Sequence, residues 1–405
     1  MVTPVETADI NADGDIISEI INSNQDLIAY FDPEYDYYAN KRYQVAYIAI
    51  GPASYSINNP YFTQIHDQIE HWANRMNVEY NRNVNFCDNI GDFSEILSEL
   101  VGNDVDGILI DYLFSDDIDN NRIHSMEQIL NESGIPWMYG MLSSYSSSQI
   151  LTESYPVIDL DEYTRGALVA ETLLDIKDAL YPDIPYENIG FITLGHTMVT
   201  GIVKRVSGAE NAWKTRTGCE DNLIRLDDSL TWLDSEYPPL KEALEEHPQY
   251  EYIFVGIMIA DQDAIGIEDY FSSRYYEGPD VNLHIVTTDI TFSPDKHNYP
   301  HRYVGDRWAS GVTEVIDAAI CLPGILHAEV VMGALYAFMS GQATPETIWP
   351  SWKSTNSEYP VFNLPYYTVT PSNFRDFYAW LDVYAGTNEF PDYYSDGITR
   401  DSFSR

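Results

Sequence analysis

The sequence predicts an α/β protein built from two doubly wound, Rossmann-like domains. From Tyr43 onward, short apolar runs bounded by polar or glycine residues alternate with longer amphipathic stretches. Runs that are apolar throughout are typical of strands buried on both faces of a parallel sheet. About ten such units exceed one comfortable sheet, and a chain of 405 residues has room for two or three domains.

Each element follows from the spacing of its apolar residues. The predicted strands are residues 45–51, 106–113, 135–140, 189–195, 252–260 and 283–289. Apolar residues that recur every three or four positions predict helices between them. These helices cover residues 61–76, 93–100, 165–180, 203–214, 239–246, 325–339 and 374–381. The regular alternation favours right-handed β-α-β crossovers, and therefore a doubly wound arrangement.

Composition excludes several classes of protein. The formal net charge of −43 repels phosphate backbones, so we expect no nucleic-acid partner. A hydrophobic content of 44% excludes a wholly disordered chain. Three cysteines, Cys87, Cys219 and Cys321, are too few for a disulfide framework or a cysteine zinc site. No nucleophile elbow, P-loop or zinc-protease motif is present, so we expect no enzyme.

Residues 1–40 are acidic and polar, and we interpret them as an N-terminal tether with one short helix around residues 16–29. The start lacks a basic and then apolar run, which is typical of a secreted chain trimmed to its mature part. Four residues in this tether match the ligand positions of an EF-hand calcium loop: Asp9, Asn11, Asp13 and Asp15. Ile20 stands where the loop needs an acid, so a solvated tail is the alternative to a structural Ca²⁺ site. We expect no other cofactor.

Three patterns occur in a telling order along the chain. Asn59-Pro60-Tyr61-Phe62 opens the first helix, Arg205-Val206-Ser207-Gly208 lies in a later helix, and Asp261-Gln262-Asp263-Ala264-Ile265-Gly266 follows a strand. In this order the sequence resembles the type I periplasmic binding proteins of the ribose- and galactose-binding, sugar ABC transporter branch. The resemblance covers about residues 43–375. It implies two lobes joined by a three-strand hinge, with crossings near Asp159, Leu322 and Leu364. The segment Asp159-Leu160-Asp161-Glu162-Tyr163-Thr164-Arg165-Gly166 resembles the first of these crossings.

The resemblance also sets the expected domain boundaries and the site. The N-terminal lobe would hold residues 41–159 and 323–363, and the C-terminal lobe residues 160–322 and 364–405. Aromatic rings would stack on a sugar face, and charged or amide side chains would bind its hydroxyls. Residues that end strands in a parallel sheet lie where such sheets bind ligands. The expected ligand-binding residues are Asn59, Tyr61, Phe62, Asp111, Trp137, Arg205, Trp232, Asp261 and Asp289.

The sequence departs from this family at two places. Its members usually end the fourth strand with Asp-Arg, whereas this chain has Trp137-Met138-Tyr139-Gly140 there. Cys321 stands where the family often has a polar residue before Leu-Pro. Both changes predict a less polar pocket, so a deoxy sugar, a larger glycan or a non-sugar ligand is open beside an ordinary monosaccharide.

We therefore expect a monomeric, extracytoplasmic solute-binding protein, periplasmic or anchored to the cell surface through lipid. It would capture a carbohydrate-like small molecule by hinge closure and deliver it to the permease of an ABC transporter. The alternative is a ligand-sensing ectodomain of the same fold that signals to a kinase or chemoreceptor. A related repressor is disfavoured because no helix-turn-helix precedes Tyr43 and the net charge is −43.

Overall fold

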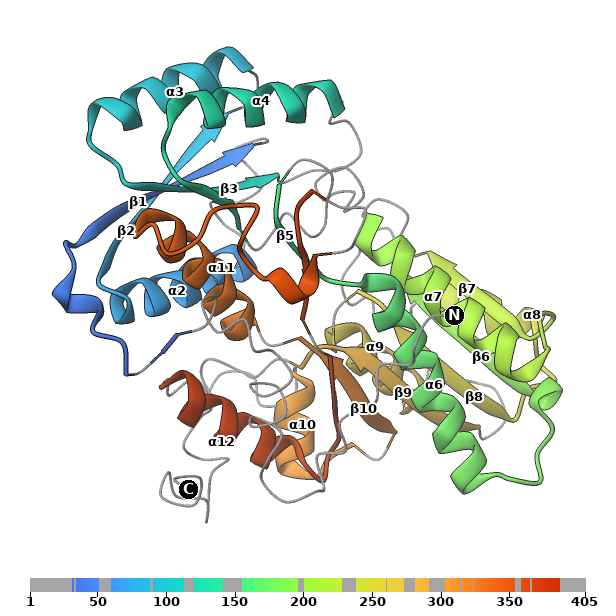
Figure 1. Cartoon of the computed structure of the whole chain (residues 1–405). Helices are drawn as coiled ribbons and strands as arrows, with labels where there is room; N and C mark the ends of the chain where they lie inside the picture. Colours follow the sequence, from blue (N-terminus) through green and yellow to red (C-terminus); the bar gives the residue numbers. More distant parts are fainter. Residues whose placement is uncertain are drawn as a thin grey trace. The chain divides into compact units, whose positions relative to one another are not determined.

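Figure 1 shows the chain as a computed structural model, in which two compact units can be described. The structure describes residues 31–32, 34–50, 60–87, 90–112, 120–140, 155–195, 200–227, 238–259, 261–272, 281–290, 303–313, 315–322, 324–353, 358–364 and 366–386. Among the described residues, unit 1 contains Asp161–Leu322 and those from Tyr366 onward, and unit 2 contains those from Phe31 to Leu160 together with those of Pro323–Leu364. The chain thus passes between the units after Leu160, Leu322 and Leu364.

Unit 2 is built on a parallel sheet with the strand order β2-β1-β3-β4. These strands are β1 (Tyr43–Ile50), β2 (Val78–Cys87), β3 (Gly107–Tyr112) and β4 (Trp137–Tyr139). Its helices are α2 (Pro60–Arg75), α3 (Ile90–Gly102), α4 (Asn120–Ser133) and α11 (Gly324–Met339). Helices α3 and α4 cover one face of the sheet, and α2 and α11 cover the other (Figure 1). A separate parallel pair joins β5 (Val157–Asp159) to β11 (Val361–Asn363).

Unit 1 is built on a larger sheet with the order β12-β10-β9-β8-β6-β7. Its parallel strands are β6 (Ile189–Gly195), β7 (Leu223–Asp227), β8 (Tyr252–Ile257), β9 (Asn282–Thr288) and β10 (Ile316–Cys321), and β12 (Tyr367–Val369) is antiparallel to β10. The helices are α6 (Glu162–Leu180), α7 (Thr200–Thr217), α8 (Pro238–Glu246), α9 (Asp261–Ser272), α10 (Val304–Ser310) and α12 (Phe374–Ala385). Helices α6 and α7 pack together and against the sheet. The predicted α/β class with two doubly wound parallel sheets is confirmed.

The central strands form because their apolar runs are buried on both sides. All seven residues of β6 are buried, and so are seven of the eight in β1. Helix α11 is apolar apart from His327 and Glu329 along its buried part, and every residue from Ile325 to Phe338 is buried. A helix without a polar face must be enclosed by the rest of its unit, as α11 is by α2, β3 and β4.

The described end of the predicted tether packs on unit 2. The Phe31 backbone N–H donates to Oε1 of the buried Glu329 at 2.9 Å. The Phe31 ring lies 4.0 Å below the Arg75 guanidinium and stacks on Tyr37 with ring centroids 5.3 Å apart. Tyr37 is only 7% exposed, whereas its neighbour Tyr38 is 69% exposed. The sequence predicts that the N-terminal lobe starts at residue 41, whereas the packed part of unit 2 already includes Phe31 and Tyr37.

Candidate functional site

A close crossing of helices α6 and α7 positions the charged side chains at one end of unit 1. A Cβ added to Gly166 of α6 would lie 1.8 Å from the backbone oxygen of Arg205 on α7. A Cβ added to Gly208 would lie 2.0 Å from the backbone oxygen of Tyr163. Only glycine permits each approach, because no side chain fits in that space. The first turn of α6 and the middle of α7 therefore lie in direct contact.

Arg205 uses this proximity to bind Glu162. Its Nε and Nη2 atoms donate to the two oxygens of the Glu162 carboxylate, with Nη2 2.7 Å from Oε1. Nη1 donates to the backbone oxygen of Met258, just after β8, at 2.9 Å. Arg205 is 3% exposed and Glu162 is 2% exposed. The sequence predicts that Arg205 binds ligand, whereas in this structure its guanidinium is directed at protein acceptors.

Arg165, one helical turn after Glu162, holds Asp289. Its Nη2 atom lies 2.5 Å from Oδ1 of Asp289 and 3.0 Å from the backbone oxygen of Ile320 in β10. Burial lowers the pKa of the Arg165 guanidinium, but the carboxylates of Asp289 and Glu162 outweigh it and leave that pKa above its ordinary value. Arg165 is therefore a permanent buried cation at the carboxyl ends of β9 and β10.

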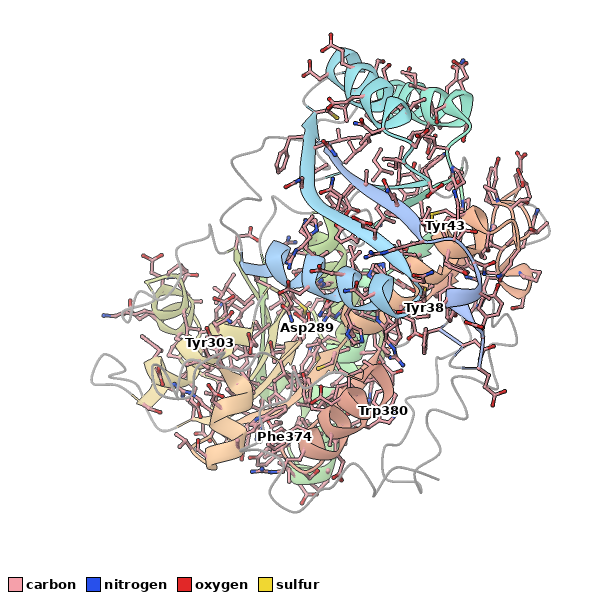
Figure 2. All side chains as sticks on the ribbon, turned by 90° about the vertical axis from the view of Figure 1, so that its left-hand side faces the viewer. Tyr38, Tyr43, Asp289, Tyr303, Phe374 and Trp380 are labelled. Carbon is pink, nitrogen blue, oxygen red and sulfur yellow. The ribbon has the colours of Figure 1, made fainter. Side chains whose placement is uncertain are left out.

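Asp289, labelled in Figure 2, is the more exposed of the two predicted acids at this end of unit 1, because Asp261 is 2% exposed. It follows β9 directly, and its φ of 67° is in the left-handed region, which aspartate tolerates better than most residues. Its Oδ1 atom also accepts the Leu322 backbone N–H at 3.2 Å. The side chain is nevertheless 46% exposed. The carboxylate is thus fixed through one oxygen, and nearly half of the side chain is exposed.

Asp261 is placed at the start of α9 and is 2% exposed. Its Oδ2 atom accepts the backbone N–H of Val304, at the start of α10, at 3.4 Å. The pattern from Asp261 to Gly266 follows β8, as predicted, and forms the first part of α9. Burial raises the pKa of the Cys321 thiol well above its ordinary value, and the charges of Asp289 and Asp261 raise it further against the opposing effect of Arg165. A buried thiol held protonated in this way is no nucleophile.

Two buried hydroxyls at this end of unit 1 have no hydrogen-bond partner among the described residues. One is Oγ1 of Thr288, which precedes Asp289 and is 1% exposed, and the other is the hydroxyl of Tyr366. The Arg165 guanidinium lies 5.4 Å from the centre of the Tyr366 ring. Buried polar atoms normally find a partner in protein, ordered water or ligand. This end of unit 1 is therefore equipped to bind polar groups.

In unit 2, Asp111 is fully buried at the carboxyl end of β3. It accepts a hydrogen bond from the Tyr47 hydroxyl. A Cβ added to Gly140 would lie 2.5 Å from its Oδ2 atom, so the glycine leaves room for the carboxylate. Burial and the charge of Asp111 together raise the pKa of Tyr47 well above its ordinary value, so the phenol stays protonated and donates. Asp111 lies near the carboxyl end of β3, as the sequence predicts, but other residues of unit 2 bury its side chain completely.

Trp137 is part of the packing of unit 2. It is 2% exposed, and its ring stacks on Tyr155 with centroids 3.6 Å apart. Its indole N–H donates to Oδ1 of Asn131 at 2.9 Å. With its ring face and its donor engaged in this way, Trp137 is a core residue in this structure, as its place in an apolar strand favours, and a contact with ligand stays a prediction.

The remaining predicted residues cannot be placed in the same detail. Asn59, Trp232 and the predicted calcium loop lie outside the described residues. Tyr61 and Phe62 belong to the first turn of α2, as predicted, but their side chains lie outside the description. Among the described residues, no group of three or more His, Cys, Asp or Glu side chains could hold a metal ion.

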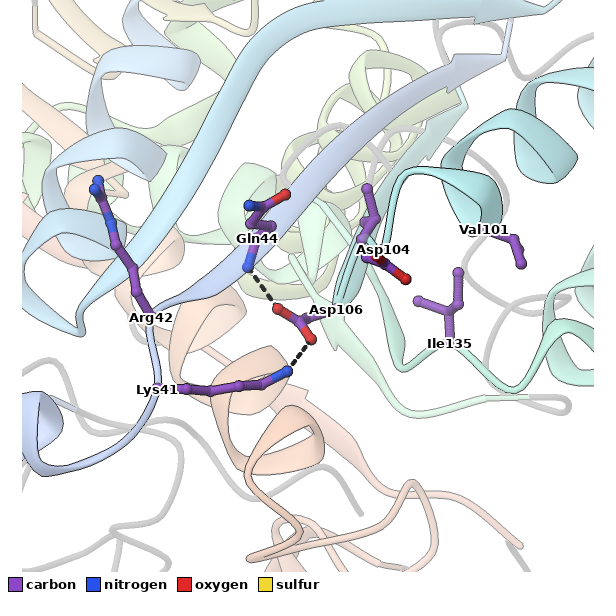
Figure 3. A pocket seen from close by; sticks show the side chains of 8 residues that line it. Lys41, Arg42, Gln44, Val101, Asp104, Asp106 and Ile135 are labelled. Atoms are coloured by element: carbon purple, nitrogen blue, oxygen red, sulfur yellow. Dashed lines mark hydrogen bonds and ion pairs between the residues drawn. The ribbon is translucent and has the colours of Figure 1, made fainter.

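A hollow of about 390 Å³ lies at the amino ends of the strands of the unit 2 sheet (Figure 3). Lys41, Gln44 and Asp106 line it where β1 and β3 begin, beside Val101 and Ile135. The Lys41 ammonium and the Gln44 backbone N–H both bind the Asp106 carboxylate. Parallel sheets bind ligands at the carboxyl ends of their strands, and this hollow is at the amino ends. We therefore take the carboxyl ends of the strands in the unit 1 sheet as the candidate site.

The sequence analysis missed Glu162 and Arg165 as members of this site. Both lie inside the segment that resembles the first hinge crossing. Arg165 stands directly before Gly166, which ends this motif. Because the whole chain has only 21 basic residues, this arginine is a local signal for a functional role. Their partners are far along the chain, however: Arg205 is 43 residues from Glu162, and Ile320 is 155 residues from Arg165.

No protein-family model and no curated protein matches the sequence. Solved structures do match the fold. A periplasmic ribose ABC transporter protein from Conexibacter woesei has a TM-score of 0.57 at 12% identity, covering 84% of this chain and 97% of that one. An ABC transporter solute-binding protein from Burkholderia graminis, in complex with D-arabinose, has a TM-score of 0.53 at 16% identity, covering 82% and 96%.

A LacI-type transcriptional regulator from Bacteroides fragilis has a TM-score of 0.52 at 14% identity, covering 84% of this chain and 100% of that one. The chain has the type I periplasmic binding protein fold. This fold is shared by sugar-binding proteins of ABC transporters and by LacI regulators, so it identifies an architecture that is used for small-molecule binding. Among the described helices of this type I fold, none is long and apolar enough to cross a membrane.

Proposed function

We propose that this chain is a solute-binding protein that captures a sugar or sugar-like molecule and delivers it to the permease of an ABC transporter. The observation that carries the proposal is the Asp289 carboxylate, held by Arg165 at the carboxyl end of β9 and 46% exposed. A fixed carboxylate with an open side accepts hydrogen bonds from the hydroxyls of a polyol, and such charge-assisted bonds are strong. Solved structures of the same fold include a complex with D-arabinose.

Further parts of the proposal come from the resemblance. The protein would act outside the cytoplasm as a monomer and close about its hinge on the ligand. Asn59, Tyr61, Phe62 and Trp232 remain proposed ligand contacts, and Asp9–Asp15 a proposed calcium loop. We propose no chemical reaction, because binding and release are sufficient for this role.

A thermal-shift screen against a broad panel of sugars and polar metabolites tests the proposal. A ligand at 100 times its dissociation constant adds about 2.7 kcal/mol to the free energy of unfolding. We expect at least one carbohydrate to raise the melting temperature in proportion to the logarithm of its concentration. A panel without any such compound would contradict the proposal. Neighbouring genes for a permease and an ATPase favour transport, whereas a neighbouring histidine kinase gene favours sensing.

A further inference from the structure

We propose that Tyr181 is a site of covalent modification, at which the phenol oxygen accepts an acyl group from an activated, uncharged acyl donor. His284 is the base that takes the phenol proton, and Asp317 is a positioning residue for His284. The three side chains lie near the amino ends of β9 and β10, whereas the candidate ligand site lies at the carboxyl ends of strands in the same sheet. This modification site is therefore separate from the ligand site of the proposed function and does not depend on it.

A chain of two hydrogen bonds joins the three side chains. The Tyr181 hydroxyl lies 3.0 Å from Nε2 of His284, and Nδ1 of the same imidazole lies 3.0 Å from Oδ2 of Asp317. Tyr181 directly follows α6, His284 belongs to β9, and Asp317 belongs to β10. A hydroxyl, an imidazole and a carboxylate in this order are an arrangement by which proteins activate a hydroxyl nucleophile, and both distances are within hydrogen-bond reach.

The Asp317 carboxylate decides which nitrogen of His284 carries the proton. Its Oδ2 atom also accepts the Ile285 backbone N–H at 3.2 Å, which fixes the carboxylate against β9. An ionised carboxylate can only accept hydrogen bonds, so neutral His284 has its proton on Nδ1 and its lone pair on Nε2. Tyr181 therefore donates its hydroxyl to the nitrogen that can take the proton. The imidazolium that then forms is stabilised by Asp317.

Tyr181 needs this base because its phenol stays protonated at neutral pH. The side chain is half-buried, and its ring meets that of Tyr252 edge-on at 4.9 Å. Burial, with the electrostatic effects of Tyr252 and Asp317, raises the pKa of Tyr181 above its ordinary value. His284 is 7% exposed and its ring lies 5.0 Å from that of Phe254, so little water competes for Nε2. In the described part of the chain, the titratable groups that face the imidazole are Asp317 from β10 and Tyr181 from the end of α6.

The proposed step conserves atoms and charge. The phenol oxygen of Tyr181 forms a bond to the carbonyl carbon of the donor, while the hydroxyl proton passes to Nε2 of His284. The bond between that carbon and the leaving group then breaks, and its electron pair departs with the leaving group. The leaving group takes the proton from His284, so the products are acylated Tyr181, the protonated leaving group and neutral His284. The formal net charge of −43 favours an uncharged donor over an anionic one.

Tyr186 is a matched control because it resembles Tyr181 in burial and acidity but has a carboxylate in place of the imidazole. It begins the short 3₁₀ helix η5 (Tyr186–Asn188), is also half-buried, and its pKa is also raised, chiefly by burial. Its hydroxyl donates to Oδ1 of Asp178 at 2.7 Å. Asp178 is also bound by Arg216 at 2.8 Å and by Lys177 at 3.3 Å. The hydrogen bond from Tyr186, and then those from the two basic residues, lower the pKa of this carboxyl, so it is a poor base.

Acetylation of the full chain with N-acetylimidazole tests the proposal. This neutral reagent transfers an acetyl group and releases imidazole, and residues 178–204 form a tryptic peptide that carries both tyrosines. Mass spectrometry of this peptide over time gives the rate at each tyrosine in the same sample. The measurement is made on the native wild type, on the wild type in concentrated urea, and on His284→Gln and Asp317→Asn. Glutamine can accept a hydrogen bond from Tyr181 but cannot take its proton.

In the native wild type we expect Tyr181 to react at least about tenfold faster than Tyr186, because general-base assistance typically contributes about 10²–10⁴-fold. In urea the ratio of the two rates should be about one, because the hydrogen-bond chain is lost. His284→Gln should bring the ratio to about one in the folded protein. Equal rates in the native wild type would overturn the proposal without any substitution, and so would a high ratio that persists in His284→Gln.

The pH dependence of the ratio tests the role of Asp317. In the wild type the ratio should fall as the pH is lowered, because a protonated imidazole cannot accept the phenol proton. Asp317→Asn should move this fall to lower pH, because the imidazolium loses its carboxylate partner. A profile that stays in place in Asp317→Asn would overturn the assignment of Asp317 as the positioning residue.

Discussion

Gly166 of α6 lies against the backbone of Arg205 on α7, so close that a Cβ at position 166 would come within 1.8 Å of the Arg205 carbonyl oxygen. The sequence patterns that contain Gly166 and Gly208 predict a hinge segment and a ligand-binding helix. In the structure both glycines serve one helix crossing, and that crossing is what allows Glu162 to reach Arg205.

Alanine at either glycine should therefore destabilise unit 1. The obstructing atoms belong to backbone, which cannot rotate away, so we expect Gly166→Ala and Gly208→Ala each to cost about 2–3 kcal/mol or more. Gly102 is the control, because a Cβ there meets nothing within 4 Å. Urea unfolding measures all three variants. A Gly166→Ala protein as stable as Gly102→Ala would contradict the close crossing.

Arg205→Ala should lower the stability of the empty protein. It would leave the buried Glu162 carboxylate without its main partner, a change that typically costs about 3–5 kcal/mol. Changing both residues, as Glu162→Gln with Arg205→Met, should recover a large part of that loss, because no unpaired charge is then buried. Thermal unfolding of the two single variants and the double variant forms the test. If Arg205→Ala instead binds sugar poorly and unfolds like the wild type, Arg205 is a ligand residue as the sequence predicts.

The adjacent residues Tyr37 and Tyr38 should respond differently to alanine. Tyr37 is 7% exposed, its ring meets that of Tyr336 edge-on at 5.0 Å, and its hydroxyl accepts the Asp32 N–H at 3.0 Å. Removal of a buried aromatic side chain costs about 3–5 kcal/mol, and we expect the lower part of this range for Tyr37→Ala. Tyr38 is 69% exposed, so Tyr38→Ala should cost less than about 1 kcal/mol. Equal melting temperatures would show that this segment is only a tether.

His327 should make unit 2 sensitive to acid. It is buried in α11, and burial lowers its pKa to about 3. A histidine in the unfolded chain has a pKa of about 6.5. Between about pH 6.5 and pH 3 the unfolded state therefore binds more protons than the folded state, so the free energy of unfolding decreases as the pH falls. This residue alone should cost about 2 kcal/mol between pH 7 and pH 5. Unfolding of His327→Leu across that range should show a smaller loss, and identical slopes would refute the assignment.

Salt should stabilise the whole protein. With a formal net charge of −43, the compact chain repels itself, and this repulsion is screened as the Debye length falls from about 30 Å at 0.01 M to about 3 Å at 1 M salt. We expect the melting temperature to rise steeply between these concentrations of potassium chloride. Sucrose at the same osmolality controls for effects that do not involve charge. A melting temperature that does not change with salt would contradict the expectation.

The sequence predicted the buried strands and long amphipathic helices well, because their apolar periodicity is a local property. It did not show β2 and β7, which lie at the edges of their sheets and carry polar residues: β2 reads VEYNRNVNFC and β7 reads LIRLD. A strand that faces solvent on one side lacks the continuous apolar run that identified β1, β3, β4, β6, β8 and β9. The buried strand β10 is also missing from the predicted strands, because its sequence IDAAIC is short and interrupted by an aspartate. Strands β5, β11 and β12 have three residues each, too few to show a period.

The candidate site was only partly predictable for a related reason. Asp289 could be recognised as a strand end, and Arg205 by its distance from Gly208. Whether such a side chain meets a ligand or a protein acceptor depends on the partner that the fold brings to it. Glu162 reaches Arg205 only through the crossing at Gly166 and Gly208, and no local pattern specifies that contact.

The Arg165 guanidinium donates a hydrogen bond to the backbone oxygen of Ile320, at the end of β10. The Arg205 guanidinium does the same for the backbone oxygen of Met258, just after β8. Free carbonyls at a strand end can fluctuate and rebind water, whereas these are tied to side chains that are themselves buried. The conformational entropy of ordering this part of the sheet is therefore lost when the protein folds and not when a ligand arrives. Capture of a small molecule at Asp289 should accordingly need little local rearrangement.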